Sequence, residues 1–321
     1  MQIQNVQNPK IPGRIIRNFK CKDGKERDVF MPLRKDNNCW NDGLPVFPRS
    51  KPLIRDGTHR PSNVLYLIRT GESIKNVFPN WTRDCFEEAP DRKDKVVYNL
   101  DDVNLPNAIP KRNINEFDKD PPLSEMGKLT ARAICKQLKN DDVALHAIYT
   151  SPFLRCMETA TCFSELLEEG VAGFNIEPGL TEYVNFPDVP VFFTPKEATD
   201  VNLKVNMKYE PVKGPLPKDK ESPSDMFVRL KGVLNDMHRR EPLTRVTAIV
   251  ATPTVLQNIS ALLRKEKGAV DRNTALKSPP SMVQVLAFEH KKWVSRDDLI
   301  PKFSYKQGCN YKMINLKDRD N

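Results

Sequence analysis

Long apolar runs and paired cysteines are both missing from this sequence. Its 321 residues contain no apolar stretch near the ~18 residues that a membrane-spanning helix needs. The first residues also lack the pattern of a secretory signal peptide. The seven cysteines are odd in number and include no Cys-x-x-Cys pair, which favours reduced thiols over a disulfide framework. We therefore expect a cytoplasmic or nuclear protein that does not associate with membranes.

Histidine and reactive cysteine are also scarce, which limits the catalytic chemistry. The only four histidines are His59, His146, His238 and His290. They lie near the start of the chain, at a strand start, in a helix and at a strand end respectively, and none falls at residues 69–72, 151–155 or 252–253, where polar residues follow expected strands. We therefore interpret each as a structural or surface residue. The sequence has no Cys-x5-Arg phosphate loop either, and Cys156 is more typical of a core position. We expect no metal and no cofactor.

Positive charge is concentrated near the start of the chain. Residues 1–60 contain 13 Lys and Arg against 6 Asp and Glu, which is +7 of the net charge of +9. They are also rich in proline and lack a periodic apolar pattern, so we predict a long irregular arm rather than a folded domain. Such an arm is either a solvated tail or a binding segment for a protein partner. Nucleic-acid association through the arm is a weaker alternative, because no known nucleic-acid module is recognisable.

Beyond residue 60 the apolar pattern alternates between strands and helices. Short β-branched runs predict strands at residues 63–69, 144–150, 246–251 and 283–288. Helices are predicted at residues 124–138, 152–167, 224–237 and 254–264. Ser151-Pro152 is a favourable start for the second helix, because serine can cap it and proline fits the first turn. This order predicts an α/β fold in which helices cover both faces of a sheet.

Polar residues follow three of the predicted strands. Arg69-Thr70-Gly71-Glu72 follows the first, Ser151 with Arg155 follows the second, and Thr252-Pro253 follows the third. Ligands of such sheets lie outside the carboxyl ends of the strands. We therefore expect these three junctions to meet at one pocket.

These motifs resemble those of the histidine phosphatase (phosphoglycerate mutase-like) superfamily. The resemblance is strongest to the phosphatase domain of the ubiquitin-associated and SH3 domain-containing proteins, also called suppressors of T-cell receptor signalling, and to insect ecdysteroid-phosphate phosphatases. Further matching motifs are Ile109-Pro110-Lys111-Arg112, Asp118-Lys119-Asp120-Pro121-Pro122-Leu123 and Glu177-Pro178-Gly179-Leu180-Thr181-Glu182-Tyr183.

The resemblance covers residues 61–315 and implies a three-layer αβα fold with a mostly parallel sheet. An arm of residues 1–60 would precede this domain and a tail of residues 316–321 would follow it. Residues 78–122 and 185–223 are then insertions that would border the pocket. Because the family members with these motifs pair through this domain, the resemblance also implies a homodimer.

The family carries histidine at two positions where this chain has threonine. Thr70 stands at the position of the phosphate-accepting histidine, and Thr252 stands at that of the second histidine. The resemblance implies that Arg69 and Arg155 match the phosphate-binding arginines and that Glu182 matches the acid. A threonine hydroxyl attacks phosphorus only with an adjacent general base, and neither motif supplies one. Both catalytic positions are therefore expected to be degenerate.

Two functions follow from these replacements. We favour a catalytically inactive pseudophosphatase that acts as a protein-interaction or scaffold module and keeps a vestigial phosphate pocket at Arg69, Arg155 and Glu182. The alternative is a phosphatase with a non-standard mechanism, in which Glu182 activates water and the arginines clamp the phosphate. A structural role for the arginines, pairing with Glu182 or Glu72, is equally open.

Overall fold

A computed structural model describes most of the chain beyond residue 62. The described residues are 63–89, 92–98, 102–182, 191–212, 221–240, 245–266 and 268–300, together with the backbone of β1 (Gly13–Lys20) and β2 (Glu26–Pro32). The expected arm therefore lies outside the described residues except for these two strands, which pair antiparallel. The expected tail, residues 316–321, also lies outside them.

The chain divides into two compact units. One contains residues 1–49 and 83–99, and the other contains residues 50–82 and 100–321. The first unit holds two antiparallel pairs, β1 with β2 and β4 (Phe86–Ala89) with β5 (Arg92–Tyr98). The second unit holds all of the predicted strands and helices.

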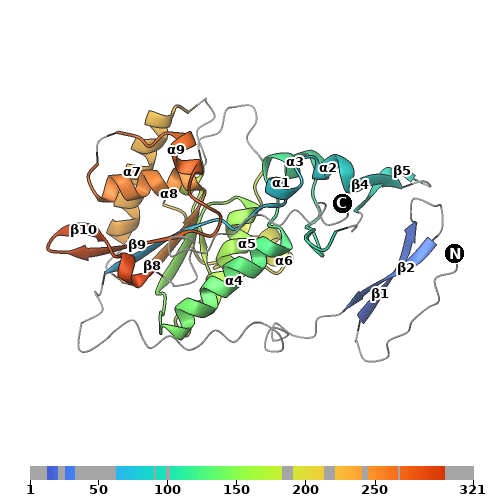
Figure 1. The fold of residues 1–321 in the computed structure, drawn as a ribbon, viewed down its shortest axis with the longest axis horizontal. Coiled ribbons are helices and arrows are strands. Elements are labelled where there is room, and N and C mark those ends of the chain that lie inside the picture. The colour runs from blue at the N-terminus through green and yellow to red at the C-terminus, as the bar shows by residue number, and fades with distance from the viewer. Residues whose placement is uncertain are drawn as a thin grey trace, which may run out of the picture. The chain divides into compact units, whose positions relative to one another are not determined.

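A six-stranded sheet forms the centre of the second unit (Figure 1). Its strands, in spatial order, are β10 (Lys292–Ser295), β9 (Val283–Glu289), β3 (Val64–Arg69), β8 (Thr247–Ala251), β6 (Ala147–Thr150) and β7 (Asn175–Ile176). The three pairs among β3, β8, β6 and β7 are parallel, whereas β9 and β10 run antiparallel to their neighbours. The predicted α/β class with a mostly parallel sheet is thus confirmed.

Helices cover both faces of this sheet, as Figure 1 shows. On one face lie α4 (Glu125–Asn140) and α5 (Leu154–Phe163), and on the other lie α7 (Pro223–Arg240) and α8 (Pro253–Leu263). Residues of β3 alternate between the two layers: Tyr66 and Ile68 join the first core cluster, and Leu65 and Leu67 join the second. Successive side chains of a strand point to opposite faces, so an apolar run such as β3 must be covered on both sides.

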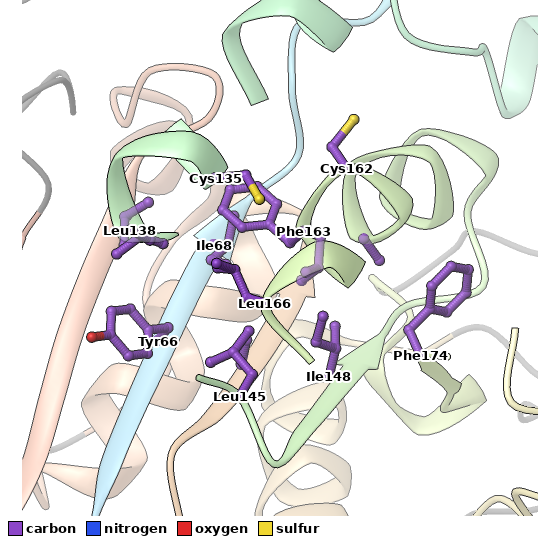
Figure 2. Close-up of a cluster of buried hydrophobic side chains, with 14 of the residues drawn as sticks. Tyr66, Ile68, Cys135, Leu138, Leu145, Ile148, Cys162, Phe163, Leu166 and Phe174 are labelled. Atoms are coloured by element: carbon purple, nitrogen blue, oxygen red, sulfur yellow. The ribbon is translucent and has the colours of Figure 1, made fainter. Parts of the chain in front are cut away.

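The first of these clusters is the core under α4 and α5. Figure 2 shows Tyr66, Ile68, Leu138, Leu145 and Phe163 packed together in it. Burial of each such large apolar side chain contributes roughly 1.5–3 kcal/mol. This packing fixes α5, whose first turn carries Arg155, against the sheet.

Short elements connect these parts. They are α1 (Ile74–Val77), α2 (Trp81–Asp84), α3 (Ile114–Lys119), the 3-10 helices η1 (Ser164–Leu166), η2 (Pro178–Leu180) and η3 (Asp297–Leu299), α6 (Pro195–Asp200) and α9 (Arg272–Leu276). The two expected insertions contain several of them. Across the described part of the chain, no helix combines the length and apolar character needed to cross a membrane.

Candidate functional site

Backbone pairing brings the three polar strand ends to one edge of the sheet. Arg69 at the end of β3 is paired with Ala251 at the end of β8. The Thr70 N–H then donates to the Ala251 carbonyl at 3.2 Å, and the Ser151 N–H donates to the Val250 carbonyl at 3.0 Å. Junctions that are about 80 to 180 residues apart in sequence therefore lie side by side, as parallel strands require.

Thr70 and Thr252, the two threonines expected at histidine positions of the family, are both buried at this edge. Thr70 is 5% exposed and Thr252 is 1% exposed. Thr252 precedes α8 at the N-cap position, but its side chain makes no capping hydrogen bond. Its buried Oγ1 has no hydrogen-bond partner among the described residues, and the same holds for Oγ of Ser281, whose N–H donates to the Thr70 carbonyl. Buried hydroxyls without partners are rare in folded proteins and often mark a bound water or ion.

The turn after Thr70 is held by hydrogen bonds to side chains. The Gly71 N–H donates to Oγ1 of Thr159 at 3.0 Å. The Glu72 carboxylate accepts a hydrogen bond from the Ser124 hydroxyl at 2.6 Å. The Ser73 hydroxyl donates to the Asn76 side chain at 2.7 Å. Neither Glu72 nor Ser73 is therefore directed to an arginine, and a structural Arg–Glu72 pair, one of the two pairings considered above, is not formed.

The guanidinium of Arg69 has a hydrogen-bond donor without a partner among the described residues. Its Nε is buried and has no hydrogen-bond partner among the described residues. Burial lowers the pKa of Arg69 to about 10, while the nearby Glu182 raises it and Arg155 lowers it. The guanidinium thus stays charged at neutral pH, and it shares its electrostatic environment with both of the other predicted site residues. It forms no ion pair with any described carboxylate, so it is available to an anion.

Arg155 is positioned by a carboxylate from another segment. Its Nη1 lies 3.5 Å from Oδ1 of Asp120, and its guanidinium lies 4.2 Å from the centre of the Phe153 ring. Asp120 is fully buried and also pairs with Arg112, Nη1 to Oδ2, at 3.1 Å. Burial raises the pKa of Asp120, and Arg155, the Leu154 N–H and Arg112 oppose that rise. Asp120 thereby links two arginines that are far apart in sequence.

Asp120 also determines where α5 begins, which differs from our prediction. We expected Ser151-Pro152 to begin this helix, but it begins at Leu154 with Phe153 at the N-cap position, and Phe153 has no capping side chain. Both oxygens of Asp120 instead accept the Leu154 N–H, at 2.8 and 3.0 Å. The first free N–H of a helix needs an acceptor, and here it comes from 34 residues upstream.

Asp120 and Arg112 are functional candidates that the sequence analysis missed. Both stand in motifs quoted for the family resemblance, and this was the only signal that could have identified them. Arg112 lies over the rings of Phe117 at 5.4 Å and Phe193 at 4.7 Å and also donates to the Val191 carbonyl. It therefore organises the wall of the site rather than facing a ligand directly.

Glu182 lies beside Arg69 and at the N-terminal turn of α8. Its Oε1 accepts a hydrogen bond from the Thr254 hydroxyl at 2.9 Å and lies 3.4 Å from Nε of Arg272. The Glu182 side chain is 14% exposed and that of Arg155 is 17% exposed, so both remain open to solvent. The ion partner of Glu182 is thus Arg272, a residue that the sequence analysis did not single out.

A buried ion pair holds the loop that carries Glu182. Arg229 of α7 binds both oxygens of Glu221, at 2.6 and 2.7 Å. Nη1 and Nη2 of Arg229 also donate to the carbonyls of Gly179 and Thr181, at 2.5 and 2.9 Å. Each of the three guanidinium nitrogens thus donates within the fold, so we assign Arg229 to positioning the loop.

The described histidines lie away from the three strand ends, and Cys156 is a core residue. His146 immediately precedes β6, and His290 lies in the turn between β9 and β10, which places both at the opposite edge of the sheet. His238 lies near the end of α7, and His59 is outside the described residues. Cys156 is fully buried, and burial raises the pKa of its thiol to about 12. Among the described residues there is also no group of three or more His, Cys, Asp or Glu that could hold a metal ion.

Comparison with known proteins agrees with this architecture. A family model described as histidine phosphatase superfamily (branch 1) matches residues 110–297. The ecdysteroid-phosphate phosphatase of Drosophila melanogaster is 30% identical over 233 residues, which is 68% of this chain and 29% of that protein. The ubiquitin-associated and SH3 domain-containing protein A of Mus musculus is 31% identical over 207 residues, which is 60% of this chain and 32% of that protein.

A solved structure shares the fold. The ecdysone phosphate phosphatase of the silk moth, in complex with tungstate, superposes with a TM-score of 0.64 at 24% identity and covers 74% of this chain and 93% of that chain. This chain spans less than a third of the length of the two curated relatives named above. Since the family model covers more than half of its residues, the chain belongs to branch 1 of the histidine phosphatase superfamily.

Proposed function

We propose that this domain is a pseudophosphatase, which does not hydrolyse phosphoesters and acts as a protein-interaction or scaffold module. The observation that carries this proposal is the pair of threonines at the strand ends, Thr70 after β3 and Thr252 after β8. Transfer through a phosphoenzyme needs a nucleophilic imidazole, and the three described histidines lie away from this edge of the sheet.

The anion-binding half of the pocket is retained in this proposal. Buried Nε of Arg69 and Oγ1 of Thr252 are both donors without a partner among the described residues. A tetrahedral oxyanion would accept hydrogen bonds from both and would also face Arg155. Each charge-assisted hydrogen bond contributes roughly 1.5–3 kcal/mol, which is enough for measurable binding without catalysis.

The surfaces that bind a protein partner are proposed to be the basic residues 1–60 and the insertions around the pocket. Of the total net charge of +9, residues 1–60 carry +7, which favours an acidic partner. The same proposal includes a homodimer formed through the phosphatase-like domain. Each chain would then present the same surface of that domain to the other.

An activity assay tests the loss of catalysis. We expect no hydrolysis of p-nitrophenyl phosphate or of a phosphotyrosine peptide above a buffer blank. The double variant Thr70→His with Thr252→His should gain weak turnover, whereas Thr70→His alone should gain less. Turnover by the unmodified chain that disappears in Arg69→Ala or Arg155→Ala would instead support the alternative, in which Glu182 activates water.

Oxyanion binding is tested separately by thermal unfolding. Tungstate or phosphate should raise the midpoint of the unmodified chain, because a ligand that binds only the folded state stabilises it. Arg69→Ala should abolish that rise. Arg239→Ala, which removes an arginine with a 77% exposed side chain, should leave it unchanged. An equal rise in both variants would show that no specific pocket remains.

A further inference from the structure

A cavity lies on the α7 face of the sheet, beside its β7 edge. It has a volume of about 740 Å³ and is lined by Tyr149, Asn175, Lys208, Tyr209, Arg240 and Arg245, among others. None of its lining residues belongs to the strand-end site, the name we give to Arg69, Thr70, Arg155, Glu182 and Thr252 together. The volume falls within the ~300–1,000 Å³ of pockets that hold small molecules.

The cavity wall is built around a buried carboxylate. Glu177 is fully buried and accepts hydrogen bonds from the Tyr209 hydroxyl and the Val212 N–H, both at 2.8 Å. The Tyr209 ring packs edge-on against Tyr149, with centroids 5.7 Å apart. These contacts fix residues 209–212 against β6 and give the cavity an aromatic wall that exists without a ligand.

Apart from the carboxylate of Glu210, the side chains that remain for a ligand are chiefly hydrogen-bond donors. Asn175 is 7% exposed, its Oδ1 accepts from Asn206 at 2.9 Å, and its Nδ2 has no partner among the described residues. Lys208 Nζ likewise has no partner there. Arg240 uses one nitrogen on the Glu210 carbonyl at 2.6 Å, and Arg245 uses one nitrogen on the His146 ring at 3.1 Å. The rest of each guanidinium stays free to donate.

The charges of the lining residues also favour a ligand that accepts hydrogen bonds. Lys208, Arg240 and Arg245 face one acidic residue of the lining, Glu210, which gives the cavity a net positive charge. A ligand that matches it must accept hydrogen bonds and carry negative charge. Met237, which is 1% exposed, and the tyrosines offer an apolar surface beside the cations.

We propose that this cavity binds a small organic polyanion, a molecule with at least two phosphate or carboxylate groups. The anionic groups contact Lys208, Arg240 and Arg245, and any ring of the ligand packs against Tyr209. This ligand is distinct from the single oxyanion proposed for the strand-end site.

Isothermal titration calorimetry with three probes tests the proposal. The probes are adenosine triphosphate, inorganic tripolyphosphate and citrate, each titrated into the full chain. We expect at least one of them to bind with a stoichiometry of one. Arg240→Ala with Arg245→Ala should weaken that binding at least tenfold, and so should Lys208→Ala, which removes a side chain without a partner in the described structure.

Two matched controls separate this site from other causes. Arg239→Ala removes the same charge from the neighbouring position of α7, where Arg239 pairs with Asp236 and does not line the cavity, and should leave the affinity unchanged. Arg69→Ala removes the proposed oxyanion site at the strand ends, so probe binding that persists in this variant belongs to the cavity. Failure of all three probes to bind below a Kd of ~1 mM would overturn the proposal. Equal weakening by Arg239→Ala, loss of binding in Arg69→Ala, or binding of a phosphopeptide but of no small anion would overturn it as well.

Discussion

Among single residues, Gly127 has very little room for a side chain. A Cβ at this position in α4 would lie 2.2 Å from the carbonyl oxygen of Glu72, a backbone atom that cannot move aside without shifting the turn after Thr70. We expect Gly127→Ala to lower the free energy of unfolding by about 3 kcal/mol, in the upper part of the range for overpacking. Urea denaturation followed by circular dichroism measures this.

The control for that substitution lies in α7. A Cβ at Gly232 would meet no atom within 4 Å. Gly232→Ala should therefore raise the free energy of unfolding by about 0.5–1 kcal/mol, because alanine loses less backbone entropy in a helix. Similar effects of the two substitutions would contradict the close approach of α4 to the first motif.

For whole elements, the contact of α7 with η2 depends on one ion pair. Arg229→Ala would leave the buried Glu221 without its partner and the Gly179 and Thr181 carbonyls without donors. We expect a loss of about 3–5 kcal/mol in the free energy of unfolding. The double variant Arg229→Met with Glu221→Met should lose less, because no buried charge is left alone. Thermal or urea unfolding compares them, and an equal loss in both variants would contradict this account.

The stability of α9 should depend on pH, because Asp271 caps its N-terminus. Asp271 accepts the Thr274 N–H at 3.0 Å, and hydrogen bonds from Thr274 lower the pKa of Asp271 from its usual 3.8. A carboxyl whose pKa is lower in the folded state stabilises that state above its unfolded pKa, and this contribution is lost as the pH falls through the folded pKa. We expect α9 to loosen only below about pH 4.

Nuclear magnetic resonance can follow this transition at the amide of Thr274. Asp271→Asn should remove the pH dependence while keeping a capping side chain. Because α9 also carries Arg272, the ion pair of Glu182 should weaken in the same acidic range. A transition of Thr274 near neutral pH would contradict this origin.

At the level of the whole molecule, the division into two units predicts the effect of truncation. Residues 1–49 belong to the first unit, and the sheet, both core clusters and the strand-end site belong to the second. Deletion of residues 1–49 should shift the thermal midpoint by only about 2–4 °C, the change expected for ~1 kcal/mol in a domain of this size. The same deletion should weaken association with an acidic partner, and high salt should weaken it in the intact chain. Unfolding of the truncated chain would show that these residues pack as part of the core.

The strongly patterned parts of the fold could be predicted from sequence alone. The strand expected at residues 63–69 is observed as Val64–Arg69, and the helix expected at 224–237 is observed as Pro223–Arg240. The positions of Arg69, Thr70 and Thr252 at strand ends followed from the same pattern. A continuous apolar run fits only a strand covered on both faces, so local sequence determines such an element.

Only the tertiary structure decided the elements and contacts that depend on distant partners. The two-residue strand β7 has no apolar run of its own, and it exists because β6 offers a free edge. The start of α5 at Leu154 depends on Asp120, and the loop before Glu182 depends on Arg229. For the start of α5 and the loop before Glu182, the side chain that satisfies the backbone group lies more than 30 residues away, where no local pattern can indicate it.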